Sequence, residues 1–183
     1  MLCAFDSLLR GCLGNRFSVP PNRVALLIEG FPRPHHPIAE FAQLLYLLRV
    51  RGAKATFVVD WQEIRERGLT SRVAEMMKLL KHNDHEVAIK FKSAPCGAPQ
   101  LRQSATEALH FLQRVYGITV VSAKVGFCVS LDAQKALKTV GVTLIEAVPN
   151  HIVVHDTDHV LADVHAALCR CVDKECVCVS VLL

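Results

Sequence analysis

Short apolar runs alternate with segments that carry apolar residues at helical spacing along most of the chain. Runs such as VALLI at 24–28 and HIVVH at 151–155 are apolar almost throughout, which predicts buried strands. β-branched and aromatic residues predict a further strand in ATFVVD. The remaining strands are expected at 85–91, 118–125, 142–148 and 176–183. The chain therefore contains the elements of one sheet.

Apolar residues three and four positions apart predict helices between these strands. Gly52, Gly117 and Gly141 stand where three of the helices should end, since glycine readily adopts the left-handed conformation that follows a helix. At the other ends, Ser130 is expected to cap one helix, and Asp156 or Thr157 the last. The helices are expected at 38–51, 73–80, 101–116, 131–140 and from about 158 to 172.

Apolar strands that alternate with amphipathic helices are typical of a mostly parallel sheet covered by helices. The length of 183 residues suits one domain with a sizeable core. We expect this single domain to span 23–183, and residues 1–22 to form an N-terminal arm that packs on it. The predicted fold class is α/β.

Composition narrows the class of protein. Hydrophobic residues make up 51% of the chain and charged residues 21%, as in a globular protein. The net charge of +4 comes from scattered lysines and arginines, which does not favour nucleic acid as a partner. No apolar run approaches the ~20 residues of a transmembrane helix, and no secretory signal is recognisable. A cytoplasmic location is therefore expected, and the oligomeric state stays open.

Four cysteines near the C-terminus raise the question of a zinc site. Cys169, Cys171, Cys176 and Cys178 follow the spacing C-x-C-x4-C-x-C, and four thiolates this close are able to hold zinc. The spacing departs from the usual C-x2-C pairs. We favour buried cysteines that behave as small apolar residues, with Cys171 on the core face of the last helix.

Polar side chains at the carboxyl ends of the strands are the candidates for function, because chemistry in such folds gathers there. They are Glu29, Asp60 with Trp61, Lys90, the stretch 124–128 and HDTDH at 155–159. For Asp156 and its neighbours, a helix cap is the simplest role, since caps need these residue types.

The order of these segments resembles the polysaccharide deacetylase (NodB homology) family from about Arg23 to the C-terminus. VALLIEGFP is similar to that family's first strand, which ends in T-F-D-D-G-P, and RGAKATFVV is similar to its K-A-T-F-F-V strand. HNDHEVAIK resembles G-H-E-I-G-N-H, and VVHD resembles L-L-H-D. The resemblance implies a small, distorted (β/α) barrel of the carbohydrate deacetylase type.

The resemblance also implies a chemistry, namely metal-assisted removal of an N-acetyl group. In that family one aspartate and two histidines hold a divalent metal, a second aspartate acts as base, and the histidine of L-L-H-D acts as acid. The base position falls on Glu29, and the acid and its partner fall on His155 and Asp156. The three metal positions fall on Gly30, Lys90 and Ala94, none of which is a ligand of that family's kind.

We therefore expect a divergent deacetylase-like protein, inactive or very weak, that retains a groove for an N-acetylated glycan or a partner. No cofactor is expected. One alternative is an active carbohydrate de-N-acetylase with one zinc or cobalt ion in an unusual ligand set, which His35 and His36 would join. As ordinary loop histidines, they would be exposed. The second alternative is an intracellular interaction protein.

Two further side chains complete the expected site. Trp61 either floors a sugar groove or packs at the edge of the core. Lys90 brings a positive charge to the place of the metal, and an ammonium or a carboxylate left alone there is costly to desolvate. We therefore predict that Lys90 pairs with Glu29.

Overall fold

The computed structural model describes most of the chain from Arg23 onward. The described residues are 23–31, 36–67, 71–91, 97–125, 130–145, 151–173 and 177–179. Their elements are β1 (Arg23–Phe31), α2 (Ile38–Val50), β2 (Thr56–Asp60), α3 (Trp61–Arg67), α4 (Ser71–His82), β3 (Glu86–Phe91), α5 (Ala98–Tyr116), β4 (Ser122–Val125), α6 (Leu131–Thr139), β5 (Thr143–Leu144), β6 (His151–His155), α7 (Val160–Asp173) and β7 (Val177–Val179). The arm expected at 1–22 lies outside the described residues.

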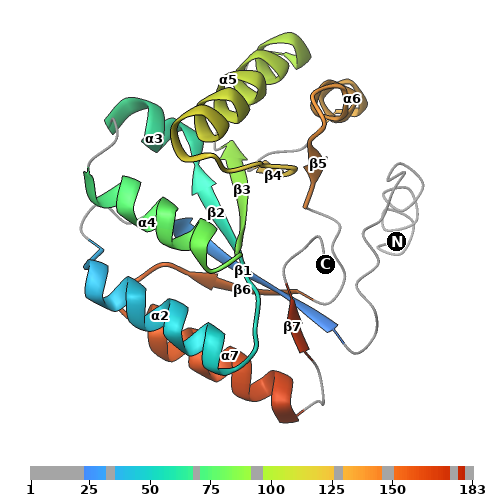
Figure 1. The fold of residues 1–183 in the computed structure, drawn as a ribbon. Helices are drawn as coiled ribbons and strands as arrows, with labels where there is room; N and C mark the ends of the chain where they lie inside the picture. Colours follow the sequence, from blue (N-terminus) through green and yellow to red (C-terminus); the bar gives the residue numbers. More distant parts are fainter. Residues whose placement is uncertain are drawn as a thin grey trace, which may run out of the picture.

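The seven strands form one parallel sheet that curves inside a layer of helices. Its hydrogen-bonded order is β5-β4-β3-β2-β1-β6, and β7 pairs with the beginning of β1. Around it, α7 contacts α2, α2 contacts α4, and α5 lies between α4 and α6 (Figure 1). The predicted α/β fold, a small and distorted (β/α) barrel, is confirmed.

The two faces of the sheet bury different side chains because successive residues of a strand point to opposite sides. The outer face packs against the helices, and its centre is a group of rings. Phe41 of α2 stacks on Phe31 at 5.0 Å between centroids, and Phe57 meets both edge-on. The inner face carries a smaller apolar cluster, which includes Leu27 and Val58. Within each strand, residues an even number of positions from Leu27 in β1 or from Val58 in β2 therefore share this parity and point to the inside of the barrel.

The local signals for helix ends agree with the structure. Gly117 ends α5 in the left-handed conformation with φ of 63°, and Ser130 Oγ accepts a hydrogen bond from the backbone N–H of Ala133 at 3.2 Å. The helix α3 was not predicted. Its signal is the D-x-x-E pattern, because Asp60 Oδ1 accepts from the backbone N–H of Glu63 at 3.1 Å.

Two strands are shorter than predicted. Pairing of β4 begins at Ser122, so the expected start at Ile118 was wrong. Ile118 and Val120 are nevertheless buried in the core, which shows that their apolar character reflects burial without strand pairing. Pairing of β5 covers only Thr143 and Leu144, at the edge of the sheet, and 146–148 lie outside the described residues.

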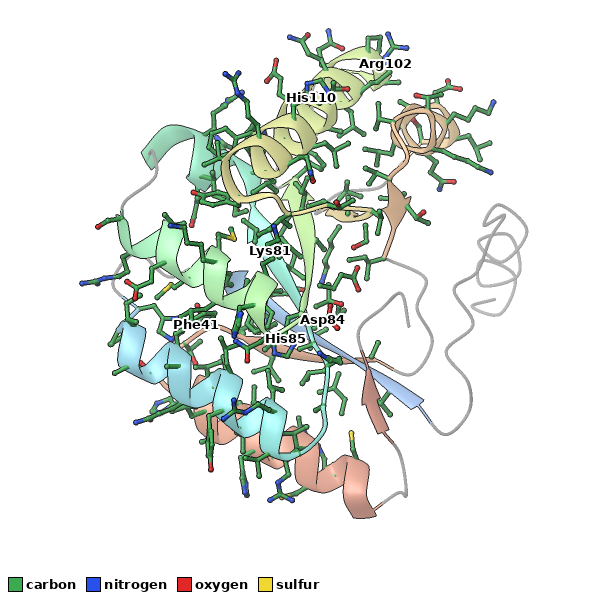
Figure 2. All side chains as sticks on the ribbon, viewed as in Figure 1. Phe41, Lys81, Asp84, His85, Arg102 and His110 are labelled. Carbon is green, nitrogen blue, oxygen red and sulfur yellow. The ribbon has the colours of Figure 1, made fainter. Side chains whose placement is uncertain are left out.

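The turn between α4 and β3, which holds Asp84 and His85, leads into the amino end of β3 (Figure 2). Asp84 has a φ of 57°, and Lys54 Nζ donates to Asn83 O at 3.0 Å and to Asp84 Oδ2 at 3.3 Å. Burial, followed by the charge of Lys54, lowers the pKa of the neighbouring His85 to about 4. These contacts fix the starts of β2 and β3 side by side.

The described helices range from 7 residues in α3 to 19 residues in α5. None of them combines the length and the apolar character that crossing a membrane requires.

Candidate functional site

The candidate site is built around Glu29, at the carboxyl end of β1. Glu29 has the same parity as Leu27, so its side chain points to the inside of the barrel, where only 3% of it is exposed. Lys90 Nζ donates to Glu29 Oε2 at 3.0 Å. The predicted pairing of Lys90 with Glu29 is therefore confirmed.

A second lysine, from the candidate stretch 124–128 but with no role assigned to it from the sequence, binds the other oxygen of the same carboxylate. Lys124 Nζ donates to Glu29 Oε1. Its signal in the sequence was its place near the carboxyl end of the apolar run ITVVSAKV. In the structure it is the direct partner of Lys90 in the pairing of β3 with β4. Glu29 thus accepts from two ammonium groups, one on each oxygen.

The curvature of the sheet makes these contacts possible. β4 lies three strands from β1, which in a flat sheet is about 14 Å at ~4.8 Å per strand. A lysine side chain is much shorter than that. Lys124 reaches Glu29 because the strands curve around a common interior, so this contact is a property of the barrel and not of neighbouring strands.

Opposing effects set the charge of the Glu29 carboxylate. Burial alone would raise its pKa, but the hydrogen bonds and positive charges of Lys124 and Lys90 outweigh burial. The pKa of Glu29 therefore lies below its ordinary value of 4.5, and the group is ionised at neutral pH. A carboxylate held in this way is a weak base.

A backbone hydrogen bond connects the end of β1 to the residue that follows β6. The pairing of β1 with β2 shifts between Glu29 and Phe31, and Gly30 at this bulge has a φ of 81°. The backbone N–H of Asp156 donates to Glu29 O at 2.6 Å. A side chain at position 30 would be strained, because this φ suits glycine and few other residues.

The neighbours His155 and Asp156 have opposite surroundings. His155 is the direct partner of Glu29 in the pairing of β1 with β6, and its side chain is exposed. Asp156 is buried, and its Oδ2 bonds to Nδ1 of the fully buried His36 at 3.0 Å. Only His155 of the two is therefore accessible to a ligand.

His36 is a correction to the expected site. It was interpreted either as an exposed loop histidine or as a binding residue, and both interpretations require an accessible side chain. The side chain of His36 is instead fully buried. Its ring meets Phe41 edge-on at 5.7 Å, and Nε2 lies 4.0 Å from Glu40 Oε2. The pair with Asp156 ties the start of α2 to the end of β6. His35 lies outside the described residues.

Two residues, Asp156 and Thr157, were proposed as caps at the start of α7, and their side chains make different contacts. Thr157 Oγ1 accepts from the backbone N–H of His159 at 3.2 Å, in the turn that leads into the helix. The contact of Asp156 with His36 gives that carboxylate a different role, which reaches 120 residues back along the chain.

Trp61 lies in the core and does not floor a groove. It is 7% exposed, and its ring meets Phe111 of α5 edge-on at 5.6 Å. Of its two interpretations, the position at the edge of the core agrees with the structure. Its place at the start of α3 turns the ring toward the outer face of the sheet.

The described cysteines do not face one another. Cys171 is buried on the core face of α7, as expected, with Val164 and Leu168. Cys169, two residues earlier and so on a different side of the helix, contacts Nδ1 of His165 at 3.7 Å. The side chains of Cys176 and Cys178 lie outside the described part of the chain.

The described donors at the carboxyl ends of the strands do not fit a divalent metal. Both oxygens of Glu29 accept from ammonium groups, which would repel a cation. Across the described ranges, no three His, Cys, Asp or Glu side chains gather closely enough to hold a metal ion. No catalytic step through a metal is therefore derived for this site.

Known proteins were compared with the chain at the levels of sequence and structure. No protein-family model and no curated protein matches it. Among solved structures, a family 4 carbohydrate esterase from Bacillus anthracis superposes with a TM-score of 0.68 at 14% identity, over 97% of this chain and 89% of that one. The esterase from Streptomyces lividans, in complex with acetate, has a TM-score of 0.65 at 15% identity, over 86% and 92%.

The chain has the fold of the family 4 carbohydrate esterases. A pseudoenzyme of this family, also from Bacillus anthracis, superposes with a TM-score of 0.66 at 10% identity. The superposition spans 87% of the present chain but only 63% of the length of the pseudoenzyme. At these identities the likeness concerns the fold, and the chemistry must be argued from the residues.

Proposed function

We propose that this chain is a carbohydrate esterase-like protein that has lost metal-assisted hydrolysis and binds an N-acetylated glycan at the carboxyl ends of its strands. One observation carries the loss of hydrolysis, namely the two ammonium groups on the Glu29 carboxylate. These ammonium groups lie beside Glu29, at the strand ends where the resemblance to the family would place a metal and its water. Several kcal/mol of transition-state stabilisation that a metal supplies would be absent.

The same observation bears on the base. A general base is most effective when its pKa lies near the working pH, whereas the pKa of Glu29 is lowered by Lys124 and Lys90 even against burial. His155 remains exposed beside it, at the position that the resemblance gives to the acid. An exposed acid beside a carboxylate of lowered pKa supports a loss of turnover.

Metal content and deacetylation test the loss of hydrolysis together. After dialysis, the protein should hold less than one zinc, cobalt or nickel ion per chain. N-acetylglucosamine oligomers should be deacetylated very slowly or not at all in buffer with added metal. One tightly held ion per chain, lost in His155→Ala, together with turnover near ~1 per second would instead establish the de-N-acetylase alternative.

A restored ligand set tests the same proposal in the opposite direction. A mutant of the Bacillus anthracis pseudoenzyme is described as having restored enzymatic activity. Here, Gly30→Asp, Lys90→His and Ala94→His together should bring stoichiometric metal binding, with strain of about 1–2 kcal/mol at position 30. If the triple variant folds and binds no metal, the correspondence of these positions with the family's ligands is wrong.

Glycan binding is measured separately. Calorimetric titration with N-acetylated oligosaccharides should give a saturable heat that is reduced in His155→Ala, because this exposed side chain lies beside Glu29. A protein that binds none of them would instead agree with the interaction-protein alternative.

A further inference from the structure

We infer that the glycan bound at this end of the barrel is acidic, and that a carboxylate of a uronic acid unit contacts Lys90 and Lys124. This inference rests on the proposed glycan binding and adds the chemistry of the ligand. Its starting point is the accessibility of the two lysines. Their side chains are 24% and 27% exposed, whereas the carboxylate between them is 3% exposed.

A ligand that approaches this cluster therefore meets donors before it meets the acceptor. An ammonium group has three N–H donors, and in the described contacts each lysine uses one for Glu29. The remaining donors lie on the partly exposed groups. The ligand atom that suits them is an oxygen acceptor.

The charge of the cluster favours an anion over a neutral acceptor. Glu29, Lys90 and Lys124 carry a net charge of +1, and Asp60, the pairing partner of Lys90, offsets it from a buried position. The carboxylates of Glu29 and Asp60 are 3% and 4% exposed, so the charges that a ligand reaches first are those of the two lysines. A hydrogen bond from an ammonium to a carboxylate is about twice as strong as one between neutral groups, so an acetamide oxygen would bind these donors less well.

The proposed binding of an N-acetylated glycan and the preference of the two lysines for an anion together describe an N-acetylated glycan that also carries carboxylates. A polymer in which uronic acids alternate with N-acetylhexosamines meets both of them. In such a chain the uronate contacts the lysines, and the neighbouring N-acetyl sugar lies toward His155, the exposed partner of Glu29.

Titration with matched oligosaccharides tests the ligand class. Hyaluronan oligosaccharides supply alternating glucuronate and N-acetylglucosamine, and chitin oligosaccharides of equal length supply the neutral comparison. We expect at least tenfold tighter binding of the acidic series, which weakens as salt rises because partly exposed charges are screened. Equal affinity for both series would overturn the inference and leave the proposed function standing. Failure of both series to bind would overturn the proposed function and the inference with it.

Two substitutions at the cluster should change the affinity in opposite directions. Lys124→Met removes a donor and a positive charge, so acidic oligosaccharides should bind about tenfold more weakly. Glu29→Gln removes the negative charge that competes for both lysines, so they should bind about three- to tenfold more tightly, as expected for one charge a few ångströms away in a partly hydrated site. A purely structural role of Glu29 would give no increase.

The matched control is Lys78→Met, at an exposed position on α4. It carries the same change of charge and should leave the affinity within twofold of the unmodified protein. Far-UV circular dichroism checks the fold of each variant. If Lys124→Met does not fold, Glu29→Gln and the salt dependence still decide. Weaker or unchanged binding by folded Glu29→Gln would contradict the inference.

Discussion

Two carboxylates on the inner face of the same sheet, one buried and one half-buried, are held in different ways. Glu29, at the carboxyl end of β1, accepts from the ammonium groups of Lys90 and Lys124. Glu86, at the beginning of β3, accepts at Oε2 from Thr56 Oγ1 at 2.9 Å and at Oε1 from Ser122 Oγ at 2.6 Å. Each carboxylate thus has a donor on both oxygens, but the donors are cations in one case and hydroxyls in the other.

The difference follows from the reach of the donors. Hydroxyl side chains are short, so the donors of Glu86 come from the two strands next to it, β2 and β4. Lysine side chains are long, and those at Glu29 come from strands two and three positions away across the barrel. The hydroxyl contacts need only the pairing of neighbouring strands, whereas the lysine contacts also need the curvature of the sheet.

The two ends therefore differ in what they offer a ligand. Thr56 and Ser122 are fully buried, so the Glu86 contacts hold neighbouring strands together without offering donors to solvent. Lys90 and Lys124 are partly exposed. Structure at one end and binding at the other are thus expected from the same face of the sheet.

The largest effect is expected when both cations of Glu29 are removed. In Lys90→Met with Lys124→Met, the ionised carboxylate would stay in the barrel without its two ammonium groups. The pKa of Glu29 should then rise, and the free energy of unfolding should fall by about 3–5 kcal/mol. Urea denaturation measures this loss.

A third substitution serves as the rescue. Adding Glu29→Gln to that double variant should recover most of the lost stability, because no buried charge remains. The matched control is Lys78→Met with Lys138→Met, which removes two lysines from exposed helix positions. If the rescue fails, or if the control loses as much stability, the pairing is not the cause.

A smaller loss is expected on acidification, because a protonated Glu29 keeps its place and some of its hydrogen bonds. Its pKa is lower in the folded protein than the ordinary 4.5, so its contribution is complete above that pH. This contribution is lost as the pH falls through the folded pKa. Urea midpoints measured downward from pH 6 should fall less steeply in Glu29→Gln than in the unmodified protein. Parallel curves would show that Glu29 is not held by its lysines.

At the other end, removal of one hydroxyl should cost less than removal of both lysines. Ser122→Ala takes away one donor to Glu86, and a hydrogen bond to a charged group contributes about 1.5–3 kcal/mol. Thr56 continues to donate to the other oxygen, so we expect a loss near the low end, about 1–2 kcal/mol. A double-mutant cycle with Glu86→Gln measures the coupling, and additive effects would mean that the two side chains do not interact.

The smallest effect is expected for a lysine–carboxylate pair outside the barrel. Lys135 Nζ lies 3.9 Å from Asp132 Oδ1 on α6, with side chains 76% and 81% exposed. Lys135→Met should change the free energy of unfolding by no more than about 0.5 kcal/mol, because water screens such a pair. A loss comparable to that at Glu29 would show that burial does not explain the comparison.

The sequence by itself determined most of the elements and their parallel arrangement. Apolar runs and helical stripes depend on local chemistry, so β1, α2, β3, α5 and α7 were predicted within a few residues. The pairing of Glu29 with Lys90 was also predictable, because both residues end apolar strands and neither charge is stable alone inside a barrel.

Only the tertiary structure decided which distant side chains meet. Lys124 reaches Glu29 because the sheet curves, and His36 reaches Asp156 because the start of α2 lies beside the end of β6. Sequence patterns describe the period of an element, and they carry no information on the curvature between strands that lie three positions apart. The second cation at Glu29 and the burial of His36 therefore appear only when the barrel is assembled.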